Sequence, residues 1–391
     1  MALRTITLSV VAAMTLITSI DAGAQRGRSS THSSNARKAK PVFVHRAEEG
    51  EAGRGRKDMR RPAAPLVIEV FKNFDAWWGD NRDSATLAAF GKVSGIDWFV
   101  HPVSELADGI SPNADVVLIT SNSFGEPGAR DEQNAPAAQA NLAAFVAGGG
   151  VLIVDMGDNL WDGGFRAPGA VGTPDLVFPA DEADAVLTAA AAGPDGVLGT
   201  TDDHRLVRGP DGVPGTADDL TNTNIDACCY VAHGNLQEGI ALPPTAVPLM
   251  TATFAGTQKP IVAEYCLGSG RVIVDTVTKE FEAHQPQGHG PSYFLSALLA
   301  YAMDPKEHIS CQINGLRESV RSMAGASPHA AGLDPKPRAA AAAIDRGSAS
   351  AACGQIGAFV NAVRAHARAF PAPVVDEWVR MAARIKSALE C

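Results

Sequence analysis

Two nearly identical acidic segments follow one another in this chain, GPDGVLGTTDD at residues 193–203 and GPDGVPGTADD at residues 209–219. Each copy combines a Pro-Asp-Gly turn, whose glycine tolerates a positive φ, with a threonine and a pair of adjacent aspartates. Oxygens gathered on a tight turn are what Ca²⁺ prefers, because this ion accepts about six to eight hard ligands in flexible geometry. The candidate metal ligands are the aspartates of both copies, Asp195, Asp202, Asp203, Asp211, Asp218 and Asp219.

The acidic repeat differs from an EF-hand loop, because Val197 and Gly199 stand where that loop has ligands after its first aspartate. The competing interpretation is a pair of Asp-Gly turns with solvated carboxylates. Carboxylates so close in sequence repel one another unless solvent or a cation neutralises them. The segment also offers the loop no apolar anchor of its own. We therefore predict either a Ca²⁺-stabilised loop or a pair of polar turns.

Polar residues that follow the predicted strands are the second group of candidate functional residues. The candidates for one cleft are Asn122, Asp155, Asp158, Asn159, Glu280 and His284. Open α/β sheets bind ligands above the carboxyl ends of parallel strands, so these side chains are expected to converge there. A carboxylate beside a histidine suits acid/base catalysis, and the same groups suit ligand binding. The alternative is that they cap helices and close turns.

Composition excludes some classes of function. The chain has 391 residues and a formal net charge of -10, which leaves room for two domains and disfavours nucleic acid, whose phosphates need a basic face. The six cysteines fit an oxidising compartment, and none has the spacing of a zinc site. They are Cys228, Cys229, Cys266, Cys311, Cys353 and Cys391.

The first residues have the pattern of an export signal. Arg4 precedes an apolar run at residues 6–20, and Ala22-Gly23-Ala24 is a small-residue cleavage site before Gln25. We expect residues 1–24 to be removed and the mature protein to be secreted or periplasmic. The later segments are too short or too interrupted by polar residues to predict a transmembrane helix.

A polar, basic linker is predicted at residues 25–64, because this stretch has too few apolar residues to offset its chain entropy. Its basic residues, among them Arg54, Arg56, Lys57 and Arg60, suit contact with an anionic cell-surface polymer. A merely solvated tail is the alternative. The partner therefore stays open, with a surface polymer or a carbohydrate as the candidates.

From residue 65 to residue 305 short apolar runs alternate with helical segments. Strands are predicted at residues 67–71, 97–101, 115–120, 151–155, 261–265 and 272–277, and helices at 84–93, 137–147 and 292–303. This alternation is typical of an α/β domain in which helices cover both faces of a parallel sheet. The acidic repeat, at about residues 193–220, interrupts the pattern as a surface insertion.

The tail at residues 306–391 is predicted to be a small helical bundle. Three amphipathic stripes begin at Ile309, Ile356 and Trp378, with a loose connection at residues 324–350. Cys353 begins one helix and Cys391 ends the next, so in an antiparallel hairpin these ends are neighbours. We expect a disulfide between them, and the pairing of the other cysteines is left open.

Several segments carry a resemblance to a known fold: ADVVLITSNSFG at 114–125, GGGVLIVDMGDN at 148–159, PIVAEYCLGSGRVIVDT at 260–276 and YFLSALLAYAM at 293–303. They resemble the class I glutamine amidotransferase-like domains, including the ThuA-like relatives, which implies a flavodoxin-like sheet. In the amidotransferases the turn after the fourth strand carries a cysteine nucleophile. Here that turn reads Asp155-Met156-Gly157-Asp158-Asn159, so amide hydrolysis by that mechanism is not expected.

The tail, from the Ala-Cys pair at 352–353 to Cys391, resembles the helical module attached to secreted bacterial multidomain proteins. The sequence therefore favours an exported, non-catalytic binding or structural protein with a Ca²⁺-stabilised loop. The alternative is a secreted hydrolase that acts on saccharide or ester bonds, with Asp158 and either Glu280 or His284 at its site. The absence of a Gly-x-Ser-x-Gly elbow disfavours a serine hydrolase and leaves carboxylate chemistry open.

Overall fold

The computed structural model describes residues 66–73, 82–120, 127–156, 164–175, 183–225, 231–277, 292–325 and 327–391. These residues belong to one compact unit, which runs from Arg61 to Cys391. The predicted signal peptide and linker lie outside the described residues. Within them, no helix combines the length and the apolar character needed to span a membrane.

A mixed sheet forms the centre of the unit, with the strand order β2-β1-β3-β4-β8-β7-β6-β5. The strands β2, β1, β3, β4 and β8 run parallel to one another, and β7, β6 and β5 continue the sheet antiparallel. Their bounds are β1 Ile68–Phe71, β2 Trp98–His101, β3 Val116–Ile119, β4 Val151–Asp155, β5 Ala183–Leu187, β6 Val247–Phe254, β7 Thr257–Leu267 and β8 Gly270–Asp275.

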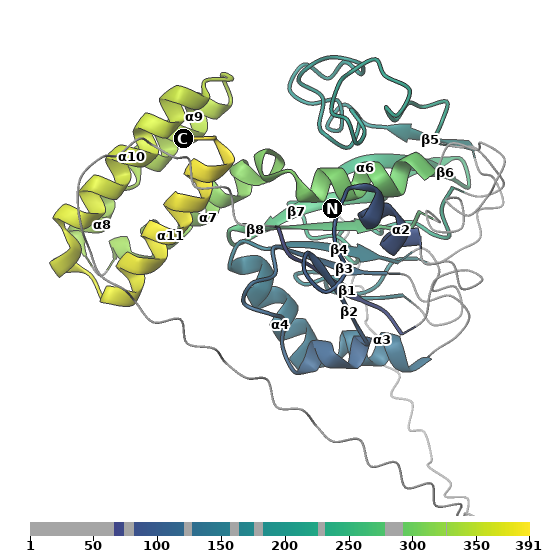
Figure 1. Cartoon of the computed structure of the whole chain (residues 1–391), viewed down its shortest axis with the longest axis horizontal. Helices are drawn as coiled ribbons and strands as arrows, with labels where there is room; N and C mark the ends of the chain where they lie inside the picture. Colours follow the sequence, from purple (N-terminus) through teal and green to yellow (C-terminus); the bar gives the residue numbers. More distant parts are fainter. Residues whose placement is uncertain are drawn as a thin grey trace, which may run out of the picture. The chain divides into compact units, whose positions relative to one another are not determined.

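Helices cover both faces of the parallel half of the sheet (Figure 1). On one face lie α2 (Arg82–Ala89) and α6 (Ser292–Met303), and on the other lie η1 (Val103–Ala107), α3 (Pro127–Asn134) and α4 (Pro136–Ala147). The central strands β1, β3 and β4 are buried along their whole length and are mostly apolar, with Glu69 and Asp155 as the charged exceptions. The α/β class predicted from the sequence is therefore confirmed.

The antiparallel half of the sheet was not expected. β7 and β8 are joined by Gly268 and Ser269 alone, and a connection this short can only form a hairpin. β6 and β5 extend that hairpin, with the acidic repeat in the chain between them. The expectation of a parallel sheet thus holds for β2, β1, β3, β4 and β8 and is wrong for β7, β6 and β5.

The acidic repeat is anchored by apolar residues, which contradicts the expectation of a loop without an anchor. Leu206 and Val207, between the two copies, are buried, and so is Leu220 directly after the second copy. All three belong to the hydrophobic cluster between the sheet and α6. The apolar contacts were missed because these residues are isolated between polar turns and show no periodicity.

The C-terminal region is helical, and its helices bury a third hydrophobic cluster. The elements are η2 Pro305–His308, α7 Ile309–Ala324, α8 Pro328–Ala331, α9 Pro335–Ile344, α10 Ala349–Ala365, η3 Ala367–Ala369 and α11 Ala372–Ala388. The predicted stripes are on the buried faces of α7, α10 and α11. The loose connection predicted at residues 324–350 is wrong, because α8 and α9 form there.

Two disulfides are present among the described cysteines. Cys353 and Cys391 are bonded, with Cα atoms 6.2 Å apart, which confirms the predicted pairing. Cys266 of β7 is bonded to Cys311 of α7, with Cα atoms 5.3 Å apart. The second bond ties the sheet covalently to the C-terminal helices. Cys228 and Cys229 lie outside the described residues.

Candidate functional site

A line of polar residues crosses the carboxyl ends of adjacent parallel strands. The strand register pairs Phe71 with Ile119, Ile119 with Val154, and Asp155 with Asp275. The position that follows Phe71, Ile119 and Val154 on each strand therefore aligns with Asp275. We call this set the polar row; its members are Lys72 after β1, Thr120 after β3, Asp155 at the end of β4 and Asp275 at the end of β8.

The side chains of the polar row lie on the sheet face that α2 and α6 cover. Side chains alternate between the two faces along a strand. Leu118 and Ile153 belong to the hydrophobic cluster under α6, so Thr120 and Asp155, two residues further on, lie on that face. Relative exposures are 8% for Lys72, 2% for Thr120 and 0% for both aspartates, so the row is a buried polar layer.

Each end of the polar row has further polar contacts. Lys72 Nζ lies 3.2 and 3.1 Å from the carboxylate oxygens of Asp83, in the first turn of α2. At the other end, the backbone N–H of the buried His233 donates to the Thr276 carbonyl at 2.9 Å. The Thr120 hydroxyl, in the middle, has no hydrogen-bond partner within the part of the chain that the structure describes.

Of the predicted cleft residues, only Asp155 can be placed. Asn122, Asp158, Asn159, Glu280 and His284 lie outside the described residues, so their convergence stays a prediction. The sequence reading missed Lys72, Thr120 and Asp275, which directly follow or end apolar runs. Strand register is the signal that would have found them. A polar residue that ends or directly follows a buried parallel strand lies at the same edge of the sheet as its register partners, and on the same face.

The two copies of the acidic repeat fold into matching turns. In the first copy Asp202 Oδ2 accepts from the Asp195 N–H at 3.1 Å, and Asp203 Oδ2 accepts from the Gly199 N–H at 2.7 Å. The equivalent distances in the second copy are 3.0 and 2.5 Å. Gly193 has a φ of 71°, and a Cβ there would lie 2.1 Å from the Asp202 carbonyl oxygen, so only glycine fits.

Acceptor oxygens crowd around the threonine of the second copy. Thr216 Oγ1 lies 2.7 Å from Asp218 Oδ1, 3.3 Å from Asp219 Oδ1, 3.3 Å from Asp211 Oδ1 and 3.0 Å from the Val213 carbonyl oxygen. A hydroxyl has one hydrogen to donate, so it cannot satisfy all of these acceptors. One oxygen from each of the three aspartates lies within 4.8 Å of the others, so the three could hold one metal ion.

The first copy has the same design with fewer contacts. Thr200 Oγ1 lies 2.7 Å from Asp202 Oδ1, 3.4 Å from Asp203 Oδ1 and 3.2 Å from the Val197 carbonyl oxygen. Asp203 is only 1% exposed and Asp219 only 6%, so solvated carboxylates, the alternative interpretation, are wrong for these two positions.

Hydrogen bonds stabilise the charged form of one aspartate in each copy, the exposed Asp202 and the half-buried Asp218. The hydrogen bond from Thr200 lowers the pKa of Asp202. Partial burial would raise the pKa of Asp218, but hydrogen bonds from Thr216 and from the Asp211 N–H outweigh it and lower the pKa overall. Both carboxylates are therefore kept ionised, which is the form that binds a cation.

Glu307 of η2 holds the chain between the two copies. Its carboxylate accepts from His204 Nδ1 and from the Arg205 N–H, both at 2.7 Å, and lies 3.6 Å from Arg208 Nη2. Burial would lower the pKa of His204, but the hydrogen bond and charge of Glu307 raise it overall. Burial would raise the pKa of Glu307, but the His204 hydrogen bond lowers it overall. His204 and Glu307 thus form an ion pair that fixes the repeat to the core.

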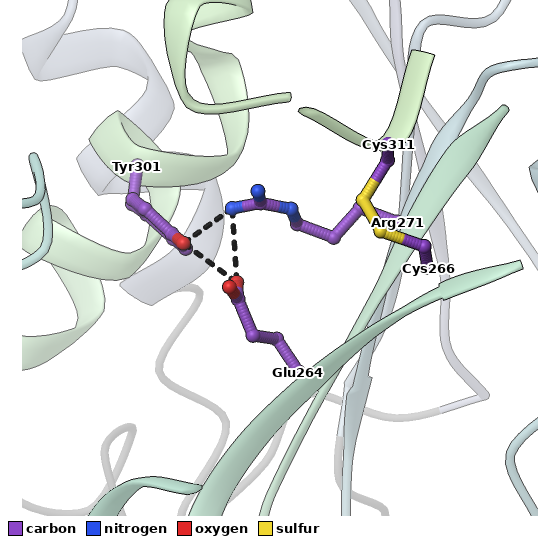
Figure 2. The surroundings of a disulfide bond; sticks show 5 residues. All are labelled: Glu264, Cys266, Arg271, Tyr301 and Cys311. Atoms are coloured by element: carbon purple, nitrogen blue, oxygen red, sulfur yellow. Dashed lines mark hydrogen bonds and ion pairs between the residues drawn. A yellow bond between two sulfur atoms is a disulfide. The ribbon is translucent and has the colours of Figure 1, made fainter. Parts of the chain in front are cut away.

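A second buried ion pair lies beside the Cys266–Cys311 disulfide (Figure 2). Arg271 Nη1 is 2.9 Å from Glu264 Oε2 and also donates to the Tyr301 hydroxyl, which donates to Glu264 at 2.6 Å. Burial raises the pKa of Tyr301 well above its ordinary value, so the phenol stays protonated and donates. This closed set satisfies groups from β7, β8 and α6, and its chemistry is structural.

Comparisons with known proteins identify no family. No family model and no curated protein matches this chain. The cytoplasmic protein STM3548 from Salmonella typhimurium is similar over 61% of this chain and 98% of its own, at 12% identity and a TM-score of 0.33. A beta-galactosidase from Bacillus circulans sp. alkalophilus is similar over 61% of this chain and 30% of its own, at 12% identity and a TM-score of 0.32. Sequence identities and TM-scores this low indicate no function for this chain.

Proposed function

We propose that this chain is an exported, non-catalytic binding or structural protein in which the acidic repeat is a Ca²⁺-stabilised loop. The observation that carries the calcium proposal is the crowding of acceptor oxygens around Thr216 Oγ1. A cation at this position satisfies the Asp218, Asp219 and Val213 oxygens that compete for the single hydroxyl hydrogen. Asp211 Oδ1 also accepts from the Val213 N–H at 2.7 Å. The oxygens of Asp211, Asp218 and Asp219 and the Val213 carbonyl are hard ligands of the kind that Ca²⁺ takes.

The same proposal includes the flavodoxin-like, amidotransferase-like character of residues 65–305. The order β2-β1-β3-β4-β8 of the parallel strands supports it, because flavodoxin-like sheets have the order 2-1-3-4-5. β4 ends at Asp155, and the residue that follows is the buried Met156, which cannot act as a nucleophile. The fold then serves to bind or to support rather than to hydrolyse an amide.

Export is supported by the cysteine chemistry. Disulfides form and persist in oxidising compartments, and the two in this chain fit a secreted or periplasmic location. N-terminal sequencing of the exported protein should begin near Gln25. Recovery of a form that keeps Met1 from the cytoplasm would contradict export.

Calorimetric titration with Ca²⁺ tests the loop. We expect a dissociation constant on the order of 10⁻⁴ to 10⁻³ M, as in other extracellular sites. At a free Ca²⁺ concentration about 100 times that constant, linkage adds about 2.7 kcal/mol to the free energy of unfolding. Asp218→Asn with Asp219→Asn should remove binding at the second copy, and Asp202→Asn with Asp203→Asn at the first.

The matched control is Asp108→Asn, which changes an exposed carboxylate outside the repeat. It should leave unchanged both the heat of Ca²⁺ binding and the rise in melting temperature that Ca²⁺ causes. If the wild-type chain shows neither at millimolar Ca²⁺, the acidic repeat is only a pair of polar turns and the proposal fails.

A secreted hydrolase acting on saccharide or ester bonds is the second candidate. The register of Asp155 with Asp275 favours it, because paired carboxylates are the groups that glycoside hydrolysis uses. Release of nitrophenol from nitrophenyl glycosides and esters tests it. Activity that Asp155→Asn removes while the fold persists supports the hydrolase, and inactivity of the wild-type chain on both substrate classes favours the binding protein.

A further inference from the structure

The polar row lies where open α/β sheets place their ligands. From β1 the chain passes outward to β2 and then returns to β3 on the other side of β1. Ligands bind outside the carboxyl ends of the strands at such a reversal. Lys72 and Thr120 follow the two strands that flank it, and Asp155 and Asp275 continue the row on the next two strands. The row is therefore at the expected edge of the sheet.

The Thr120 hydroxyl is the observation that points to a ligand. It is 2% exposed and has no hydrogen-bond partner among the residues that the structure describes. A buried hydroxyl without a partner destabilises the fold, and such groups in folded proteins usually contact an ordered water or an ion. A hydroxyl next to a carboxylate ordinarily donates to it, yet Thr120 does not donate to Asp155, its neighbour in the row.

Asp155 and Asp275 bring two carboxylates together in a buried place. They pair in register on adjacent strands, whose separation is about 4.8 Å. Both lie on one sheet face and both are 0% exposed. Carboxylates this close repel each other when both are ionised, and a shared proton, a cationic side chain or a metal ion relieves the repulsion. A metal ion can take both carboxylates and also the Thr120 hydroxyl oxygen as ligands.

We propose that the polar row binds a divalent cation of the Mg²⁺ class through the carboxylates of Asp155 and Asp275, with the Thr120 hydroxyl as a third oxygen ligand. Mg²⁺ typically takes one or two carboxylates and keeps several waters, which fits so small a set of protein ligands on rigid strands. This site is separate from the acidic repeat and does not depend on the repeat binding Ca²⁺.

Titration of the full-length chain with Mn²⁺, followed by the electron paramagnetic resonance signal of free Mn²⁺, tests the site. The titration is done on a background with Asp203→Asn and Asp219→Asn, which changes one aspartate in each repeat copy. We expect one Mn²⁺ per chain, displaced by Mg²⁺. Asp275→Asn should weaken binding by more than about 100-fold, because even outer-shell partners contribute about 10- to 100-fold.

Thr120→Val is the second variant, and its near-identical shape keeps the fold. It should weaken Mn²⁺ binding by about tenfold. A merely structural Thr120 would leave Mn²⁺ affinity unchanged on this substitution. Asp108→Asn, an exposed carboxylate, is the matched control and should bind as the background does.

Two outcomes overturn the proposal: no bound Mn²⁺ on the repeat-deficient background, or Mn²⁺ affinity that Thr120→Val leaves unchanged. If Asp275→Asn does not fold, the Thr120→Val result decides. Loss of Ca²⁺ binding by the acidic repeat, with Mn²⁺ still bound at the polar row, would contradict the proposed loop function and leave this site standing.

Discussion

His308 is a buried histidine that stays neutral in the folded protein. Its Nε2 donates to the Ala302 carbonyl at 2.9 Å, and its ring lies 6.3 Å from that of Tyr301. Burial lowers its pKa to about 3, and the nearby charge of Arg271 acts in the same direction. In mild acid, the unfolded chain therefore binds a proton at His308, whereas the folded chain keeps this histidine neutral.

The stability of the protein should accordingly fall in mild acid. Because the folded pKa of His308 is depressed, its stabilising effect is complete above the unfolded pKa of 6.5 and is lost as the pH falls towards about 3. Each pH unit within that window removes about 1.4 kcal/mol. Urea unfolding at several pH values between 7 and 4 should show a steeper loss for the wild-type chain than for His308→Gln.

The control for this measurement is His329→Gln, at an exposed histidine of the C-terminal helices. Its pH profile should follow that of the wild-type chain. Equal slopes for His308→Gln and the wild-type chain would show that other groups cause the acid sensitivity.

The acidic repeat can be predicted from residue types and spacing alone, whereas the polar row cannot. Each copy of the repeat is contiguous in sequence, so its aspartates, turns and glycines were all visible in one window. The members of the polar row come from four separate strands, and only strand order and register bring Asp275 beside Asp155. The contact between Glu307 and His204 could not be predicted for the same reason, because the two residues are 103 positions apart in the chain.

At the level of elements, η2 and the acidic repeat are coupled through Glu307. Glu307→Gln removes the charge that holds His204 and Arg208, and we expect it to cost about 1 to 3 kcal/mol. Glu307 has a lowered pKa, so its contribution is present above 4.5 and is lost as the pH falls through its folded pKa. His204 has a raised pKa, so its contribution is complete below 6.5 and is lost as the pH rises through its folded pKa. The pair is therefore fully effective at about pH 5 to 6.

Hydrogen exchange at residues 204–208 measures this coupling, with faster exchange expected in Glu307→Gln near pH 6. The matched control is Glu390→Gln, which removes an exposed ion pair with Lys306 at 2.9 Å. Exposed pairs contribute little, so this variant should exchange as the wild-type chain does. Unchanged exchange in Glu307→Gln would show that the apolar anchor at Leu206 and Val207 suffices alone.

Elements with a strong local signal were predicted with accurate bounds. β4 and α6 match their predicted ranges, because each is an uninterrupted apolar segment with clear ends. β6 was missed, since Pro248 and alternating threonines obscure its pattern. The richness of residues 324–350 in alanine, glycine and proline predicts a loose connection where α9 forms. Pro335 and Pro337 nevertheless fit the first turn of this helix, where the missing N–H of proline has no partner to lose.

The described part of the molecule is built around separate hydrophobic clusters, and one disulfide links the sheet to the C-terminal helices. One cluster lies on each face of the sheet, and a third is confined to the C-terminal helices. The Cys266–Cys311 bond crosses from the sheet to α7, whereas the Cys353–Cys391 bond stays within the helical region. Their sequence separations are 45 and 38 residues, so chain-entropy arguments give each a similar stabilisation of about 4 kcal/mol.

The two bonds should nevertheless differ in their effect on cooperativity. Removal of the crossing bond by Cys266→Ala with Cys311→Ala takes away the disulfide between β7 and α7, so the helices can unfold before the sheet. Scanning calorimetry should then resolve two transitions. Cys353→Ala with Cys391→Ala, the matched control, lowers the stability of the helical region while Cys266–Cys311 still links it to the sheet. A single transition in the first double variant would show that packing at Gly315 against Ser269, rather than the disulfide, makes the two regions unfold together.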